Sequence, residues 1–166
     1  EVFLFSDTVV GNVAYGNPDQ PREETLKYLK AAAADGFSRK LEDGYDTLIG
    51  ERGVGLSGGQ KQRLALARAL SMKPSVLILD DTTSAVDMET EKFIQQQLRT
   101  LDFPCTKMIV AQRISSLKNA DQIIVLDHGR IIEWGTHAQL LRKHGYYYRI
   151  WALQNSVEEE EVHLGA

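Results

Sequence analysis

The stretch from Leu56 to Leu70, LSGGQKQRLALARAL, constrains the fold of this chain more than any other segment. A serine and two adjacent glycines come before a run of good helix formers, and Lys73–Pro74 follows it. This order predicts a helix over residues 58–72 with Ser57 at its N-cap, because serine caps helices well and proline stops them.

The start of this predicted helix has the chemistry of a phosphate-binding site. The first turn of a helix carries unpaired N–H groups and about half a positive charge. Gly58 and Gly59 leave the backbone open to a phosphate, while Ser57 and Gln60 add polar side chains. The alternative is an ordinary Ser-Gly-Gly helix cap that binds nothing.

The composition narrows the class of protein. The formal net charge of −4 and the pI near 5.6 do not favour a nucleic-acid partner. A single cysteine, Cys105, excludes an internal disulfide and a Cys-rich zinc site. No apolar run approaches the ~18–20 residues of a membrane span. The chain opens on EVFLFSD, so we expect it to be the later part of a longer polypeptide.

A second motif is the apolar run SVLILDD, which ends in Asp80 and Asp81. Ligands bind at the carboxyl ends of parallel strands in α/β folds, so this is a favourable place for acids. Asp80 could hold Mg²⁺ through water, and Asp81 is placed to activate a water molecule. The alternative is that these acids cap the helix that we expect over residues 87–101.

The pattern along the chain predicts an α/β fold with a mainly parallel sheet after a mostly helical lobe of about 60 residues. The acidic run at 158–161 is expected to be a solvated, frayed tail. Helices are expected over 8–15, 22–34, 37–41, 58–72 and 87–101, with two more within 136–154, and strands over 75–79, 107–111, 122–127 and 130–135.

Taken together, these motifs resemble the ATP-binding-cassette (ABC) family. LSGGQ at 56–60 resembles the family's signature motif, and residues 76–81 resemble its Walker B strand. Ser84, Ala85, Val86 and Asp87 match the D-loop, and Ala111-Gln112-Arg113 takes the place of the switch loop. The resemblance implies the second half of a P-loop NTPase (RecA-like) core with an inserted α-helical subdomain. It divides the chain into a signature subdomain with its helix (1–73), the later half of the core (74–154) and an acidic tail (155–166).

The family's P-loop sequence, G-x-x-x-x-G-K-S/T, is not found in these 166 residues, and the resemblance explains why a phosphate-binding helix is present nonetheless. ABC nucleotide-binding domains pair head to tail, and each ATP lies between the P-loop of one domain and the signature helix of the other. The resemblance therefore implies ATP and Mg²⁺ as ligands, a second nucleotide-binding domain as partner, and a P-loop upstream of Glu1. The residues that would contact the partner's ATP are Leu56, Ser57, Gly58, Gly59 and Gln60. Asp87 and the rest of the D-loop would communicate across the dimer.

One short segment points to the exporter branch of the family. Glu51-Arg52-Gly53 resembles the X-loop that couples exporter nucleotide domains to their membrane domains. FLFSDTVVGNVAYG and GRIIEWGTHAQLL are also similar to exporter sequences. This implies transmembrane domains upstream in the same polypeptide and a location at the cytoplasmic face of a membrane. The alternative is a soluble ABC protein without transport function.

Two positions depart from the family pattern. Asp81 stands where the catalytic base is usually Glu, and Gln112 stands where the switch residue is usually His. A shorter carboxylate is misplaced by about 1 Å, which can lower a rate by ~10²-fold, and glutamine cannot relay a proton as imidazole does. Both changes indicate a degenerate site in one half of a heterodimeric exporter. One alternative is a fully active homodimer in which Asp81 and Gln112 do not impair activity. The other is a subunit that binds ATP without hydrolysing it.

Overall fold

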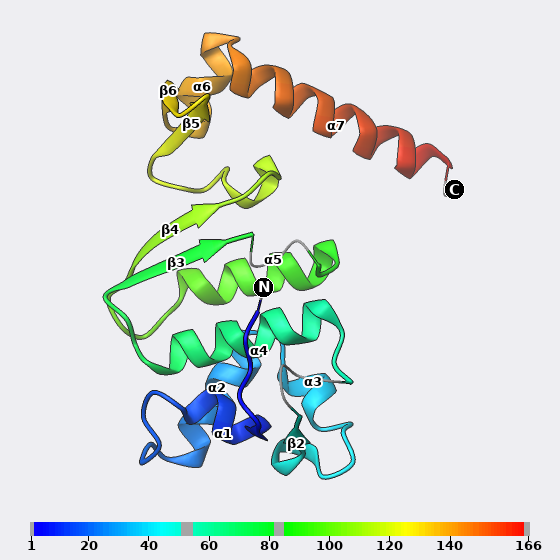
Figure 1. Cartoon of the computed structure of the whole chain (residues 1–166). Helices are drawn as coiled ribbons and strands as arrows, with labels where there is room; N and C mark the ends of the chain where they lie inside the picture. Colours follow the sequence, from blue (N-terminus) through cyan, green and yellow to red (C-terminus); the bar gives the residue numbers. More distant parts are fainter. Residues whose placement is uncertain (1, 51–54, 82–84, 165–166) are drawn as a thin grey trace. The chain divides into compact units, whose positions relative to one another are not determined.

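The computed structural model of the chain describes residues 2–50, 55–81 and 85–164 (Figure 1). Four residues with expected roles, Glu51, Arg52, Gly53 and Ser84, lie outside these ranges. The chain forms two compact units, Glu1–Val110 and Ala111–Ala166. The boundaries expected at 73/74 and 154/155 stay a prediction.

The first unit begins with short helices, as the sequence predicted. Where the prediction had a helix over 22–34, α2 ends at Ala31, because Ala33 adopts a left-handed φ of 54° and Ala34 N–H donates to Leu29 C=O at 2.7 Å. The third helix starts at Asp35, two residues before the predicted start. In order, the elements are β1 (Asp7–Thr8), α1 (Val9–Ala14), α2 (Arg22–Ala31), α3 (Asp35–Ser38), η1 (Gly44–Asp46), β2 (Leu48–Ile49) and α4 (Gly58–Ser71).

A single β-α-β unit completes this first part of the chain. Strand β3 (Val76–Asp80) pairs in parallel with β4 (Thr106–Val110), and α5 (Met88–Arg99) connects them. The register runs from Val76 opposite Thr106 to Asp80 opposite Val110. The predicted alternation of strand and helix is therefore confirmed here.

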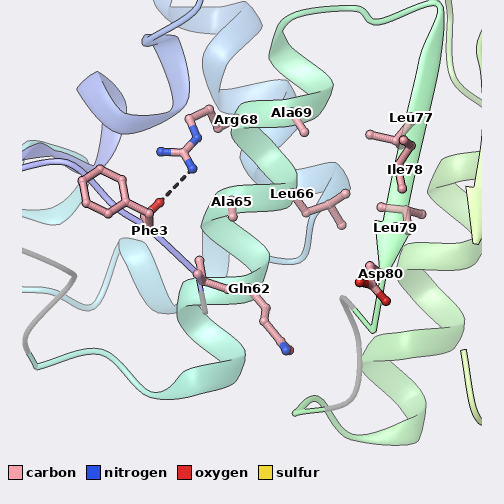
Figure 2. Close-up of a pocket in the computed structure, with 11 residues that line it drawn as sticks. Phe3, Gln62, Ala65, Leu66, Arg68, Ala69, Leu77, Ile78, Leu79 and Asp80 are labelled. Atoms are coloured by element: carbon pink, nitrogen blue, oxygen red, sulfur yellow. Dashed lines mark hydrogen bonds between the residues drawn. The ribbon is translucent and has the colours of Figure 1, made fainter. Parts of the chain in front are cut away.

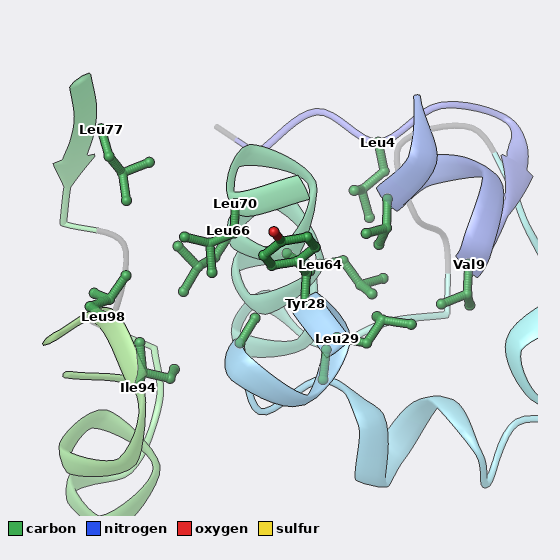
Figure 3. Close-up of a cluster of buried hydrophobic side chains, with 14 of the residues drawn as sticks. Leu4, Val9, Tyr28, Leu29, Leu64, Leu66, Leu70, Leu77, Ile94 and Leu98 are labelled. Carbon is green, nitrogen blue, oxygen red and sulfur yellow. The ribbon is translucent and has the colours of Figure 1, made fainter. Parts of the chain in front are cut away.

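The core of the first unit joins α4 to its neighbours on both sides (Figure 3). Leu66 and Leu70 of α4 belong to one buried cluster with Leu77 of β3 and with Ile94 and Leu98 of α5. The cluster continues to Leu4, Val9, Tyr28, Leu29 and Leu64.

Strand β3 is buried on one face only, and β4 is exposed apart from the half-buried Ile109, whereas the apolar runs in the sequence predicted fully buried strands. Burial alternates along β3: Leu77 and Leu79 are buried, while Val76 and Ile78 are 56% and 64% exposed. On β4, Met108 is 57% exposed. The physical reason is that successive strand residues point to opposite faces, and one face packs onto the helical core.

The second unit contains an antiparallel hairpin and two helices. Strands β5 (Ile123–Asp127) and β6 (Arg130–Gly135) are joined at His128 and Gly129, whose φ angles of 44° and 74° suit a two-residue hairpin turn. The remaining elements are η3 (Ile114–Ser116), α6 (His137–Lys143) and α7 (Tyr146–Leu164). Their core is Ile114, Ile123, Leu140 and Tyr147.

Two expectations about the fold are wrong. The described strands form three separate pairs, of which only β3–β4 is parallel, instead of the expected mainly parallel sheet. The acidic run at 158–161 was expected to be frayed, but it lies within α7, which continues to Leu164.

Candidate functional site

The start of α4 is held by a complete capping box. The Ser57 hydroxyl oxygen accepts the Gln60 backbone N–H at 3.2 Å, and the Gln60 side-chain oxygen accepts the Ser57 N–H at 2.9 Å. The expected N-cap is therefore confirmed. Among the described residues the Ser57 oxygen acts as an acceptor, so its hydroxyl proton can still be donated to an anion. Leu56 packs against the edge of the core just before the cap.

The two glycines of this turn differ in what surrounds them. A Cβ on Gly59 would lie 2.5 Å from the Ala85 carbonyl oxygen and 3.4 Å from a Val86 methyl carbon. A Cβ on Gly58 would meet nothing closer than the Ala85 Cβ at 3.9 Å. Gly59 is thus required by the close approach of the chain at Ala85, which the sequence analysis did not foresee. Gly58 is the glycine that leaves the first turn accessible.

The acids at the end of β3 are both exposed. Asp81 has a left-handed φ of 49°, a conformation that Asp tolerates better than most residues, and its N–H donates to Val110 C=O at 3.0 Å. Neither acid caps α5. That cap is Asp87, whose carboxylate accepts the Thr90 N–H at 2.8 Å and the Thr90 hydroxyl at 2.7 Å.

These Thr90 contacts have an electrostatic effect. The backbone N–H of Thr90, and then its hydroxyl, lower the pKa of the Asp87 carboxyl below its usual value of 3.8. Asp87 is exposed at the N-cap of α5, directly after the buried Val86. The alternative that Asp80 and Asp81 cap the following helix is therefore wrong, and Asp87, which was expected to be the first residue of that helix, is its N-cap.

Gln62 of α4 connects the helix to the segment that follows β3, and the sequence had not indicated this residue. Its side-chain nitrogen donates to Asp81 C=O at 3.4 Å, and its side-chain oxygen accepts the Ala85 N–H at 3.3 Å. The available signal was helical spacing, since Gln62 stands four residues before Leu66, which faces the core beside β3.

A pocket of about 350 Å³ lies between α4 and β3 (Figure 2). Gln62 and Asp80 lie at one end of it, Leu77 lies toward the other end of β3, and Leu66 faces the strand between them. Arg68 closes the opposite side by donating to Phe3 C=O at 2.8 Å. The pocket therefore borders both the helix that carries the signature residues and the strand that carries the acids.

Arg63 and Arg68 of α4 are half-buried and make contacts within the first unit. Arg63 donates to Ala33 C=O at 2.9 Å and to Gly59 C=O at 3.2 Å, and burial lowers the pKa of its guanidinium. Arg68 lies over the Phe5 ring, 5.2 Å from its centroid. Both arginines therefore stabilise the helical part of the first unit.

Gln112, which the resemblance matched to the switch position, belongs to the second unit and is exposed. Its carbonyl oxygen accepts a hydrogen bond from the Gln154 side-chain nitrogen at 2.9 Å. The Gln154 side-chain oxygen accepts the Ile114 N–H, also at 2.9 Å. The sequence carried no signal for Gln154, because it stands near the end of the chain, where a solvated tail was expected to begin.

The residues present fit a bound nucleotide and its metal. Gly58 leaves room for an anion at a helix start, and the exposed Asp80 carboxylate is an oxygen ligand of the kind that Mg²⁺ prefers. Within the described ranges, no cluster of three or more His, Cys, Asp or Glu side chains could enclose a metal ion. The same ranges contain no helix long and apolar enough to cross a membrane.

Comparison with known proteins agrees with this geometry. The family described as "ABC transporter" matches residues 4–84. An uncharacterized ABC transporter ATP-binding protein of Bacillus subtilis, YknU, is 56% identical over 154 residues, which is 93% of this chain and 26% of that protein. An ATP-dependent lipid A-core flippase of Legionella pneumophila is 47% identical over 163 residues, covering 97% of this chain and 28% of the flippase. A bacterial Atm1-family ABC exporter solved with ATP bound is 43% identical with a TM-score of 0.84, over 92% of this chain and 27% of that one.

The chain therefore belongs to the ABC transporter ATP-binding domains, and its fold is that of the P-loop NTPases. Its relatives include exporters. It spans about a quarter of the length of the relatives that it matches.

Proposed function

We propose that this chain is part of the ATP-binding and ATP-hydrolysing component of an ABC exporter. ATP-driven closure of two nucleotide-binding domains would switch membrane domains of the same polypeptide between inward-facing and outward-facing states. The nucleotide domain would then lie at the cytoplasmic face of a membrane. Support comes from the similarity to a flippase and to an Atm1-family exporter over more than nine-tenths of the chain.

The observation that carries this proposal is the construction of the α4 start. Its cap is complete, Gly58 is open, and Gly59 is packed against Ala85. A helix start fixed in this way costs little reorganisation when a phosphate binds. We propose that Leu56, Ser57, Gly58, Gly59 and Gln60 bind ATP held by the P-loop of a second nucleotide-binding domain.

The other residues have separate proposed roles. Asp80 would hold Mg²⁺ through water, Asp81 would act as the base for the attacking water, and Gln112 would contact the γ-phosphate or that water. Bound ATP and Mg²⁺ supply the phosphoryl group and the charge neutralisation that its transfer requires. Ser84, Ala85, Val86 and Asp87 would communicate across the dimer. Glu51, Arg52 and Gly53 would couple to the membrane domains.

We further propose that the site containing Asp81 and Gln112 is degenerate and that the partner subunit carries the competent site. The carboxylate of Asp81 is one methylene shorter than that of Glu, and Gln112 cannot relay a proton. The second candidate is a homodimer with two active sites, which is consistent with Asp81 keeping its carboxylate. A soluble ABC protein is a third candidate, and the exporter relatives weigh against it.

The test is ATPase turnover of the complete subunit, first alone and then with the subunit encoded beside its gene. Negligible turnover alone and robust turnover together would support the degenerate site. Full turnover alone would contradict it. We expect residues 1–166 by themselves not to hydrolyse ATP, since they contain no P-loop.

A further inference from the structure

The side chain of Gln154 holds the backbone on both sides of Arg113. Its nitrogen donates to Gln112 C=O and its oxygen accepts the Ile114 N–H, both at 2.9 Å. These partners stand 42 and 40 residues away in the sequence. An amide is suited to this task, because it provides a donor and an acceptor at the end of one side chain.

Gln154 is itself fixed by the packing of α7. Trp151 stands three residues earlier on the helix, so it lies near the same face, and it packs against the cluster of Ile114, Ile123 and Tyr147. Ile114 is thus held through its side chain by the core and through its N–H by Gln154. The position of the segment that carries Gln112 therefore depends on α7.

We propose that Gln154 is a positioning residue for Gln112 and that α7 is thereby part of the ATP-sensing apparatus. The proposal rests on the role proposed above for Gln112 at the γ-phosphate. A Gln112 side chain can direct its amide at a phosphate only if its own backbone is held in place. Gln154 supplies one hydrogen bond to the carbonyl of Gln112 and one to the N–H two residues later.

The experiment measures the affinities of the complete transporter for ADP and for a non-hydrolysable ATP analogue. In a heterodimer, the P-loop lysine of the partner is replaced so that only this subunit's own site binds nucleotide; in a homodimer this is unnecessary. A contact with the γ-phosphate exists with the ATP analogue and not with ADP. The ratio of the two dissociation constants therefore reports the γ-phosphate contact, because a general loss of stability would weaken the binding of both nucleotides equally.

We expect Gln112→Ala and Gln154→Ala each to lower the preference for the ATP analogue by about fivefold, which is the order of one hydrogen bond, with ADP affinity unchanged. The double variant should be no worse than either single variant, because both changes disable the same contact. Gln154→Glu keeps an acceptor for Ile114 but loses the donor to Gln112, so it should behave like Gln154→Ala. Asn155→Ala is the matched control, since the Asn155 side chain donates to Trp151 C=O of its own helix at 2.9 Å.

The outcomes separate this inference from the proposed function. If Gln112→Ala lowers the preference for the ATP analogue and Gln154→Ala does not, the positioning role is overturned alone. If Gln112→Ala leaves the preference unchanged, the proposed role of Gln112 fails and the inference fails with it. An equal loss of affinity for both nucleotides in Gln154→Ala, or additive losses in the double variant, would show a structural role only and overturn the proposal.

Discussion

The start of α4 and the end of β3 lie in one unit, yet they are held in different ways. At the start of α4, a capping box joins Ser57 to Gln60 within four residues. At the end of β3, Asp81 is held by long-range bonds, from its N–H to Val110 C=O and from the Gln62 side chain to its carbonyl oxygen. The difference teaches that the first turn of α4 is largely a local structure, whereas the end of β3 depends on contacts with distant parts of the chain.

The largest expected effect is at the acid end. Asp81→Glu should raise turnover at this subunit's own site by about 10²-fold, because the carboxylate moves by about 1 Å toward the expected position of the base. The left-handed backbone of Asp81, less favourable for Glu than for Asp, opposes part of this gain. The measurement is the ATPase rate of the complete transporter with the partner's own site disabled.

Asp81→Gln is the matched control for that prediction, since it has the length of Glu without its carboxylate. It should not raise the rate. An equal rate for the native protein and for Asp81→Glu would contradict the interpretation that a short carboxylate limits this site.

The next largest effect separates the two glycines. Gly59→Ala should lower the free energy of unfolding by about 1–3 kcal/mol, because its Cβ would stand 2.5 Å from the Ala85 carbonyl oxygen. Gly58→Ala meets no such contact and should change stability by less than about 0.5 kcal/mol. It should nevertheless slow hydrolysis at the partner's site, since a methyl group would stand where the phosphate approaches.

The measurements are the thermal unfolding temperature and the ATPase turnover of each glycine variant. If both variants unfolded at the same temperature, the close approach of Ala85 to Gly59 would not matter for stability.

A smaller effect is expected at the cap. Ser57→Ala removes the oxygen that accepts the Gln60 N–H and should cost about 1 kcal/mol of stability. Ser57→Thr keeps that oxygen and should cost less. Denaturant unfolding of the two variants provides the measurement, and equal losses would show that the capping box contributes little to the start of α4.

The smallest effect concerns Asp87 and its dependence on pH. Its folded pKa is lowered by Thr90, so the stabilisation is complete well above 3.8 and is lost as the pH falls through 3.8 toward the lower folded value. Asn can cap the helix but does not titrate in this range. The stability of the native protein relative to Asp87→Asn should therefore fall between about pH 5 and pH 3.

The measurement is the denaturant midpoint of the native protein and of Asp87→Asn at several pH values between about 5 and 3. A difference that stays constant with pH would mean that the Thr90 contacts do not depress the pKa of Asp87.

Local sequence determined most of the elements and several features of the site. The Ser57 cap, the α4 helix, the acids at the end of β3 and the turn at His128–Gly129 follow from short-range rules, since capping, helix propensity and hairpin turns each involve a few neighbouring residues. The motif spacing was also sufficient to indicate the family that the comparisons show.

Only the tertiary structure decided how these elements meet. Glycine is needed at position 59 because the Ala85 carbonyl oxygen lies close to it. The Gln62 side chain connects the start of α4 to the segment after β3 through its bond with Ala85. The Gln154 side chain donates a hydrogen bond to the backbone of Gln112. Each contact joins residues between 23 and 42 positions apart, as in the bonds of Gln62 with Ala85 and of Gln154 with Gln112. No local pattern encodes such pairs, because the chain must first pack its apolar faces before these polar groups come within hydrogen-bonding distance.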